Sequence, residues 1–315
     1  MSAVFERVAV VGLGLLGGSV ALAAKRRGVA VRVVGATRRE DARERALRQG
    51  AVDEIASLDE VARGADLVIL ATPVYAMADA LRGLAPALGE GAIVTDVGSV
   101  KTPLVESLPG LLPPGAVYVG SHPMAGSHER GMEHAREDLF DGASCIVTRA
   151  GDARAADRVC AFWRGVGAVV VQRDARVHDE EVAWVSHVPH VLAFAFARAL
   201  AAAPAGARDV AGAGFRDFTR IARSDAELWG DILTANGKAL AAPLHAVADA
   251  LTELTRAIEA GEVETLEGLL ESGRQALARM SAIRSEERKV REDSKLPSSS
   301  QRGDDETGER NTDHE

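Results

Sequence analysis

A histidine lies among glycines and a proline in GSHPMAGSH, residues 120–128. This residue, His122, comes just past a short apolar run, AVYV, that is typical of a β-strand. Because an imidazole titrates near neutral pH, His122 could accept a proton from a substrate hydroxyl. Two other roles stay open for it: a metal ligand, or a neutral histidine that caps the turn.

A glycine motif near the start of the chain, GLGLLGGS, has the spacing G-x-G-x-x-G at Gly12, Gly14 and Gly17. The first glycine allows a tight turn, the second lets the backbone approach a pyrophosphate, and the third lets the helix pack closely. The positive end of the following helix favours the phosphate charge. The motif predicts a dinucleotide site, with Leu15 and Leu16 beside the glycines.

Three further segments end β-prone runs: ADLVILATP with Thr72, IVTDVGSVK with Ser99 and Lys101, and VYVGSHPMAGSH with Ser121 and His122. Open parallel sheets bind ligands at the carboxyl ends of their strands. We therefore expect Thr72 and Ser99 to contact the cofactor. We expect Ser99, Lys101, Ser121 and His122 to converge near its nicotinamide.

The segment HDEEVAWVSHVPH, residues 178–190, carries three histidines. His187 and His190 lie about one helical turn apart, but no His-Glu-x-x-His core and no cysteine accompany them, so we predict no metal site. Pro189 lacks a backbone donor and should kink the helix, which leaves carbonyls near Val185 in want of partners. The alternative to a functional role is that His187 and His190 satisfy this buried kink.

The segment GFRDFTRIARSD, residues 214–225, brings together Arg216, Arg220 and Arg223. In a chain of net charge -9, such a cluster is a candidate clamp for a carboxylate or phosphate, because arginine donates in a bidentate fork. The alternative is a solvated face in which the arginines pair with Asp217, Asp225 and Glu227.

The elements that must position these residues follow an α/β pattern. Up to about residue 175, β-prone runs alternate with helical segments, which predicts a Rossmann-type parallel sheet with helices on both faces. We expect a dinucleotide-binding domain over residues 1–175 and an all-α domain over 176–284. Residues 285–315 are charged and polar, so we expect a disordered tail there.

The composition limits the partners. Of the 315 residues, 46 are acidic and 37 are lysine or arginine, which argues against nucleic acid or an anionic membrane. Two cysteines favour a reducing compartment and a cytoplasmic location. Glycines weaken the apolar run 8–24 as an export signal, and the apolar run 182–197 suits a helix buried between domains or subunits better than a membrane span.

The motifs VGLGLLGGS, TDVGSVK, GSHPMAGS, HDEEVAWVSHVPH and GFRDFTRIARSD, in this order, resemble the prephenate/arogenate dehydrogenase family of tyrosine biosynthesis. The resemblance covers residues 8–240. It implies oxidative decarboxylation of prephenate to 4-hydroxyphenylpyruvate, or of arogenate to tyrosine, with reduction of NAD or NADP. It also implies a helical domain that forms a homodimer.

The resemblance implies roles for single residues. His122 matches the histidine that accepts the ring hydroxyl proton, and Ser99 matches the serine that orients it. Arg220 matches the arginine that grips the ring carboxylate, while His190 and His178 match histidines that line the site. We place Ser121 with the substrate as well. The chain departs from the family at His128, where an acidic residue linked to gating is common.

The cofactor choice depends on Thr37, Arg38 and Arg39, about 20 residues beyond the glycine motif. In this fold, the residue that closes the second strand selects the adenosine ribose. Thr37 stands where NAD-dependent family members carry aspartate, and two arginines follow it, so the sequence favours NADP with NAD still usable. The alternative is that both arginines begin a helix, pair with Glu40, Asp41 or Glu44, and leave either cofactor accepted.

Two other functions share some of these features. A β-hydroxyacid dehydrogenase or imine reductase would carry a catalytic lysine or aspartate on the second domain's first long helix, where this chain has SHVPH. A dinucleotide-binding regulator without turnover would keep GLGLLGGS but would need neither His122 nor the arginine cluster.

Overall fold

The computed structural model describes residues 3–126, 129–149 and 151–293, with the backbone alone from residue 281. Contacts within the chain divide it into two compact units, residues 1–245 and 246–315.

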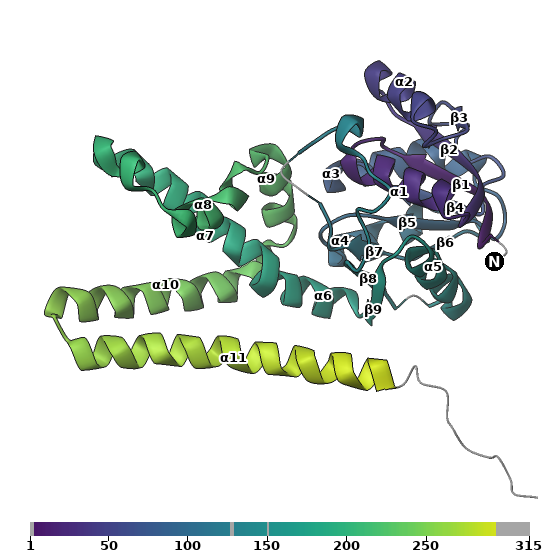
Figure 1. The fold of residues 1–315 in the computed structure, drawn as a ribbon. Coiled ribbons are helices and arrows are strands. Elements are labelled where there is room, and N and C mark those ends of the chain that lie inside the picture. Colours follow the sequence, from purple (N-terminus) through teal and green to yellow (C-terminus); the bar gives the residue numbers. More distant parts are fainter. Residues whose placement is uncertain (1–2, 127–128, 150, 294–315) are drawn as a thin grey trace, which may run out of the picture. The chain divides into compact units, whose positions relative to one another are not determined.

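The first unit begins with a six-stranded, all-parallel sheet (Figure 1), which confirms the predicted Rossmann-type fold. Its strands lie in the order β3-β2-β1-β4-β5-β6. They are β1 (Phe5–Val11), β2 (Ala30–Ala36), β3 (Glu54–Ile55), β4 (Leu67–Leu70), β5 (Ile93–Asp96) and β6 (Val117–Tyr118). The sequence did not predict β3, because two residues offer no apolar run.

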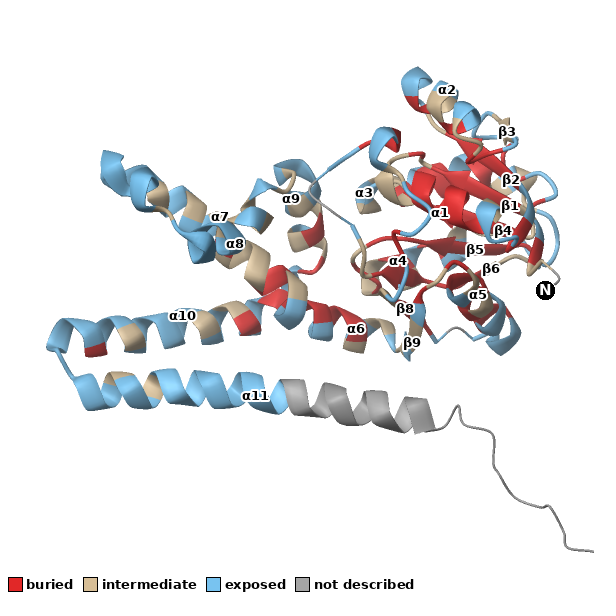
Figure 2. Ribbon diagram, in the orientation of Figure 1, coloured by how far each residue is buried: buried red, intermediate tan, exposed pale blue. Residues whose placement is uncertain are grey.

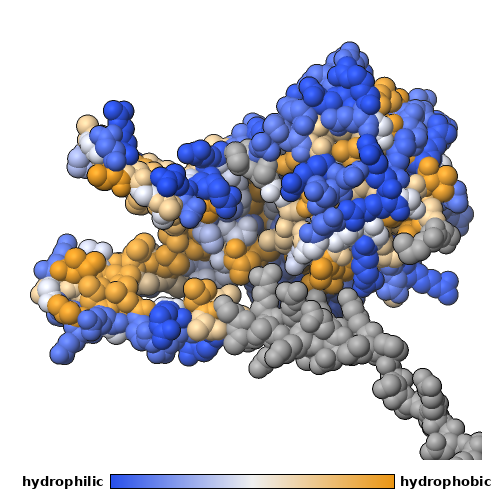
Figure 3. All heavy atoms as spheres, in the orientation of Figure 1, coloured by the Kyte–Doolittle hydropathy of each residue, from blue (hydrophilic) through white to orange (hydrophobic). Residues whose placement is uncertain are grey.

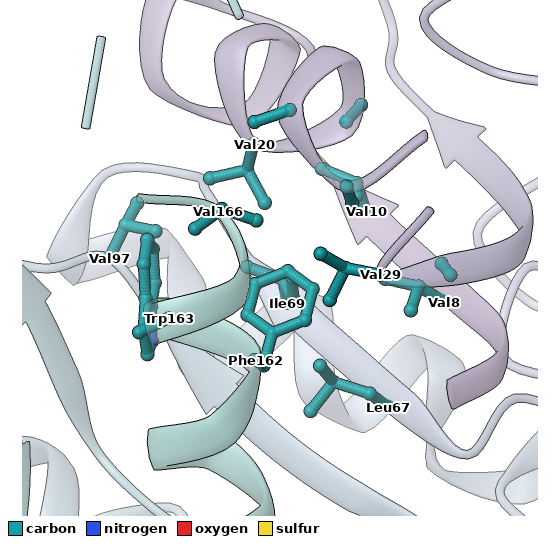
Figure 4. Packing of buried hydrophobic residues seen from close by; sticks show 14 of the residues in the cluster. Val8, Val10, Val20, Val29, Leu67, Ile69, Val97, Phe162, Trp163 and Val166 are labelled. Carbon is teal, nitrogen blue, oxygen red and sulfur yellow. The ribbon is translucent and has the colours of Figure 1, made fainter. Parts of the chain in front are cut away.

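Helices cover both faces of this sheet. They are α1 (Leu15–Arg26), α2 (Glu40–Arg48), α3 (Val74–Leu84), α4 (Thr102–Ser107) and α5 (Ala153–Gly165). Side chains of β1 alternate: Val8 and Val10 belong to one core cluster with α1 and α5, and Ala9 and Val11 to another with α3 and α4. Figure 4 shows Phe162 of α5 packed within the first cluster, and Figure 2 shows the central strands buried.

A second sheet of three strands follows, β7 (Ser121–Pro123), β8 (Ser144–Thr148) and β9 (Val169–Arg173). Strand β7 runs antiparallel to β8, and β8 runs parallel to β9. Two expectations are therefore corrected: the sheet is not single, and His122 lies within a strand rather than just past one. The run AVYVGSHP is split because Gly120 exchanges hydrogen bonds with Thr148 of the second sheet, at 2.8 and 3.0 Å.

The rest of the first unit is helical, as predicted. Its elements are α6 (Ala175–Val182), a π-helical turn (Ala183–His187), α7 (Val188–Ala199), α8 (Ala213–Arg220) and α9 (Ala226–Ala235). After Pro189, Nδ1 of His190 donates to the carbonyl oxygen of Ser186 at 2.9 Å. One histidine therefore satisfies a carbonyl of the irregular turn.

The stretch from Ala175 to Ala202 is one helix, and by length and composition alone it could cross a membrane. Only 17% of its most apolar window is buried in this chain, so the expected burial is not reached within it. However, Asp179 in its first turns accepts hydrogen bonds from the backbone of Lys101 and Thr102. These bonds attach the helix to the sheet domain.

Two long helices complete the chain: α10 (Gly237–Ala260), which crosses the division at residues 245 and 246, and α11 (Val263–Asp293). Apolar side chains are exposed on α10, such as Leu251 and Ile258 (Figure 3). The disordered tail predicted from residue 285 is wrong for residues 285–293, which belong to helix α11; Glu, Lys and Arg have favourable helix propensities. Residues 294–315 lie outside the described residues.

Candidate active site

A cleft of about 660 Å³ lies within the first unit, between the carboxyl ends of the parallel strands and the helices α7 to α9. Eight of the residues expected to form the site line it. They are Gly14, Leu15, Leu16, Thr72, Ser99, His122, His190 and Arg220.

The glycine turn occupies one end of this cleft. Gly12 has φ +99°, and a Cβ there would lie 2.6 Å from the carbonyl oxygen of Ala71. A Cβ on Gly17 would lie 1.9 Å from the carbonyl oxygen of Gly12, so the turn and helix α1 pack too closely for any side chain. A Cβ on Gly14 would meet only open space. The open position is the one from which a pyrophosphate could approach the backbone.

The amino end of α1 is also free to receive an anion. Gly14 caps the helix without a side-chain hydrogen bond, and the first turn carries no acidic residue. Thr72 lines the cleft, and its buried hydroxyl has no partner among the described residues. A hydroxyl without a partner, a bare helix end and a glycine facing open space fit a dinucleotide phosphate.

Thr37, Arg38 and Arg39 follow β2 and lie outside the cleft itself. Arg39 pairs with Asp41, and the carbonyl oxygen of Thr37 accepts a hydrogen bond from Arg43 at 2.9 Å. Arg38 is exposed and makes no hydrogen bond or ion pair with the part of the chain that the structure describes. The pairing alternative therefore holds for Arg39 but not for Arg38.

His122 is hydrogen-bonded to a second histidine. Its Nδ1 lies 2.8 Å from Nε2 of His178, and Nδ1 of His178 lies 2.8 Å from Oδ1 of Asp179. His178 is fully buried and does not line the cleft, which corrects the expectation that it contacts the substrate. The reason is that both of its ring nitrogens are already bonded within the protein.

Burial and hydrogen bonds decide the protonation of Asp179 and His122. Burial opposes ionisation of Asp179, but hydrogen bonds from His178 and from the backbone N–H groups of Lys101 and Thr102 outweigh it and lower the pKa of Asp179. Burial, with smaller contributions from His178, Lys101 and His187, lowers the pKa of His122 well below its usual value. His122 is therefore neutral near pH 7, and its Nε2 is the ring nitrogen left for the cleft.

Two residues expected at the site lie behind it instead. The ammonium of Lys101 is fully buried against the carboxylate of Asp96. The hydroxyl of Ser121 is buried too, 2.9 Å from Oγ1 of Thr95, and it accepts a bond from Trp163 at 3.0 Å. Neither residue lines the cleft, because both are bonded to Asp96 in the interior: Lys101 through its ammonium and Ser121 through its backbone N–H.

Ser99 does line the cleft, on the loop after β5. Among the described residues its hydroxyl makes no hydrogen bond to His122, whose Nδ1 is hydrogen-bonded to His178 instead. Ser99 remains available to a bound ligand.

The opposite wall of the cleft is helical. Arg220 ends α8, and His190 of α7 stacks on Trp229 of α9 with ring centroids 3.6 Å apart. Burial lowers the pKa of His190, and the nearby charge of Arg220 lowers it further.

Within the described residues, the three clustered arginines form no ion pair with the acids of their own segment. Asp225 instead pairs with Arg130 and caps α9 through the N–H of Leu228. The alternative of a solvated, self-paired arginine face is therefore not what the structure has, and Arg220 is open to the cleft.

Sequence reasoning missed Asp179, Trp229 and Asn236. Asp179 stands beside His178 in HDEE, so the signal was an acid adjacent to a histidine at a helix start. Asn236 donates to the carbonyl of Asp179 and to Nδ1 of His187, both buried, and no local pattern points to it. His128, the departure from the family pattern, lies outside the described residues, and the described residues hold no cluster suited to a metal ion.

Comparisons with known proteins agree with this geometry. Residues 20–172 match the family described as "Prephenate dehydrogenase, nucleotide-binding domain", and residues 174–272 match "Prephenate dehydrogenase, dimerization domain". The cyclohexadienyl dehydrogenase of Zymomonas mobilis is 34% identical over 87% of this chain and 96% of its own length. The prephenate dehydrogenase of Lactococcus lactis is 30% identical over 85% and 76%.

Solved structures give the same result. The prephenate dehydrogenase of Aquifex aeolicus, in complex with hydroxyphenyl propionate and NAD+, has a TM-score of 0.80 and 31% identity, covering 88% of this chain and 98% of its own. Synechocystis arogenate dehydrogenase has a TM-score of 0.73 and 30% identity, covering 87% and 99%. The two family matches together span most of the chain, and this chain belongs to the prephenate dehydrogenase family.

Proposed function

We propose that this protein catalyses the oxidative decarboxylation of prephenate to 4-hydroxyphenylpyruvate, with NAD+ or NADP+ reduced. The observation that carries the proposal is the position of His122. It lines the cleft between the glycine turn and Arg220, and its Nδ1 is occupied by His178, which leaves Nε2 as the base.

The glycine turn and its neighbours are assigned to the dinucleotide. Backbone around Gly12, Gly14 and Gly17, with Leu15, Leu16 and the hydroxyl of Thr72, would hold the dinucleotide, which supplies the hydride acceptor when bound. We assign Ser99, which lines the cleft from the loop after β5, to contact both cofactor and substrate.

His122 takes the ring hydroxyl proton at Nε2 as the hydride leaves the same carbon. The bond to the ring carboxylate then breaks and carbon dioxide departs. The electron pair of that bond makes the ring aromatic, and Nε2 of His122 returns its proton to the ring oxygen, which gives the phenol. Aromaticity drives this loss, so the protein mainly has to orient the ring. We assign Arg220 and His190, which line the cleft, to hold its carboxylate.

Arogenate is the second candidate substrate, and one observation favours it. Glu227 lines the cleft, and its exposed carboxylate makes no ion pair among the described residues. A carboxylate there could receive the ammonium group that distinguishes arogenate from prephenate.

We also propose that the enzyme prefers NADP to NAD. Arg38 is an exposed guanidinium without a partner in the described part of the chain, and no carboxylate stands at Thr37 to repel a 2′-phosphate. These features support NADP over NAD.

We propose in addition that the helical domain, beginning near residue 176, joins two copies into a homodimer in the cytoplasm. Phe196, Phe215 and Phe218 form an aromatic cluster on α7 and α8 that is substantially exposed in the single chain. A second copy would cover such a cluster. Sedimentation of the purified protein measures the mass directly.

The deciding experiment is an assay of the purified protein with prephenate and with arogenate, each with NAD+ and with NADP+. Absorbance at the wavelength of the reduced nicotinamide reports turnover, and the aromatic product is identified by chromatography. We expect turnover of at least one substrate, lowered ~10²-fold or more in His122→Asn. Cofactor binding without turnover of either substrate would instead indicate a dinucleotide-binding regulator.

A further inference from the structure

Three groups form a hydrogen-bonded chain that ends in the cleft. Asp179 is ionised and can only accept, so Nδ1 of His178 must carry the proton of their 2.8 Å bond. In the neutral form of the fully buried His178, Nε2 is the acceptor, and it accepts from Nδ1 of His122 at 2.8 Å. The donor and acceptor of both hydrogen bonds are therefore fixed by Asp179, at the buried end of the network.

We propose that Asp179 and His178 are positioning residues, which hold His122 in the tautomer with hydrogen on Nδ1 and so reserve Nε2 as the base. The proposal rests on the proposed function for its kinetic test alone. The tautomer itself can be measured whatever the substrate proves to be.

Among the charged groups near His122, Asp179 is the carboxylate that can fix the tautomer of His122. The groups that face His122 are His178 of α6, His187 of the π-helical turn and Lys101 before α4. The charge of Lys101 is matched by Asp96, to which it is bonded with both side chains fully buried. Asp179, with 4% of its side chain exposed, is thus the anion linked to His122 through hydrogen bonds when the imidazole takes a proton.

Asp179 also fixes where its helix stands. Its Oδ1 accepts from the N–H of Lys101 at 2.7 Å, and its Oδ2 accepts from Thr102 at 2.8 Å. These two N–H groups follow the loop that carries Ser99 into the cleft. The carboxylate of Asp179 therefore bonds both to His178, which holds His122, and to the backbone that follows the Ser99 loop.

Spectroscopy of the histidine rings tests the tautomer. The protein is labelled with nitrogen-15 in its histidine rings, and His122→Asn identifies the signals of residue 122. We expect wild-type His122 to carry hydrogen on Nδ1 at pH 7. A ring with hydrogen on Nε2 would overturn the proposal, and this measurement needs no turnover.

Two substitutions at one position separate positioning from packing. His178→Gln can still present an oxygen to Nδ1 of His122, whereas His178→Asn can reach Asp179 but not His122. We expect kcat to fall about 100-fold in His178→Asn and less than tenfold in His178→Gln, since general-base catalysis contributes ~10² to 10⁴. Cofactor affinity should be unchanged in both.

The carboxylate is tested by Asp179→Asn, with Glu180→Gln as a matched control on the exposed side of the same helix. We expect Asp179→Asn to lower kcat at least tenfold with KM within about threefold, because a general base contributes through kcat, and the control to change neither. Equal kcat values for His178→Asn and His178→Gln, or an unaltered kcat in Asp179→Asn, would reduce both residues to a structural role.

Discussion

His190 of α7 stacks on Trp229 of α9, with ring centroids 3.6 Å apart and planes inclined by 19°. His190 is held from its other side, because its Nδ1 donates to Ser186. The wall of the cleft nearest Arg220 is therefore built before any substrate arrives. We expect such a wall to set the affinity and orientation of the substrate, whereas we assign the proton transfer to His122 on the opposite side.

Replacing His122 by asparagine separates these two contributions. Asparagine can still donate a hydrogen bond but does not accept a proton near neutral pH, so we expect kcat to fall ~10²- to 10⁴-fold with KM nearly unchanged. Steady-state kinetics with saturating cofactor provides the measurement. Unchanged turnover would remove His122 from the role of base.

Arg220→Ala should act on KM. A charge-assisted bond to a carboxylate contributes about 1.5 to 3 kcal/mol, so we expect KM for the substrate to rise roughly 10- to 100-fold while cofactor affinity stays the same. Arg223→Ala is the matched control, since Arg223 is an exposed arginine of the same segment that does not line the cleft. Loss of cofactor affinity in Arg220→Ala would assign Arg220 to the nucleotide site or to folding.

Local patterns predicted the fold because apolar periodicity and glycine spacing are local properties. The strands β1, β2, β4 and β5 and the glycine turn were all visible in this way. The division of residues 117–123 into β6 and β7 was not, because it depends on Thr148, 28 residues away from Gly120, and on Asp96.

The sequence correctly predicted which residues face the cleft in most cases, but it also assigned to the cleft two residues that are buried beneath its floor, Ser121 and His178. Ser121 and His178 stand in the right motifs, yet Trp163 and Asp179 draw their polar atoms into the interior. A sequence pattern does not show on which side of a motif the cleft lies. Trp229 and Asn236 stand alone in helical segments, and only the tertiary structure gives them neighbours.

The glycine turn allows a matched pair of substitutions. A Cβ on Gly14 meets nothing within 4 Å of the protein, so Gly14→Ala should fold with an unchanged Tm and bind the dinucleotide at least tenfold more weakly. A Cβ on Gly17 would lie 1.9 Å from a backbone oxygen, so Gly17→Ala should lower the Tm as well. Calorimetric titration and thermal melting distinguish the two results. Full cofactor affinity in Gly14→Ala would place the pyrophosphate elsewhere.

His187 makes stability depend on pH. It is fully buried, and burial lowers its pKa to about 4. A histidine whose folded pKa lies below its unfolded value near 6.5 contributes stability above pH 6.5, which is lost as the pH falls towards 4. Between pH 7.5 and 5 we expect a loss of about 2 kcal/mol from this residue. Urea unfolding of wild type and His187→Gln at both pH values measures it, and an equal loss in the two proteins would contradict this assignment.

Cofactor preference should depend on Arg38 rather than Arg39. Arg39 is already paired with Asp41, whereas Arg38 has no partner in the described part of the chain and stands just after Thr37 at the end of β2. We therefore expect a higher kcat/KM with NADP than with NAD, and a charge-assisted contact of about 1.5 to 3 kcal/mol implies that Arg38→Ala lowers this ratio roughly tenfold or more. Arg39→Ala, the neighbouring control, should change the ratio less, because its guanidinium is engaged. The ratio is measured from initial rates with each cofactor at fixed substrate. A wild type that favours NAD, or a ratio that Arg38→Ala leaves unaltered, would show that the residues after β2 do not contact a 2′-phosphate.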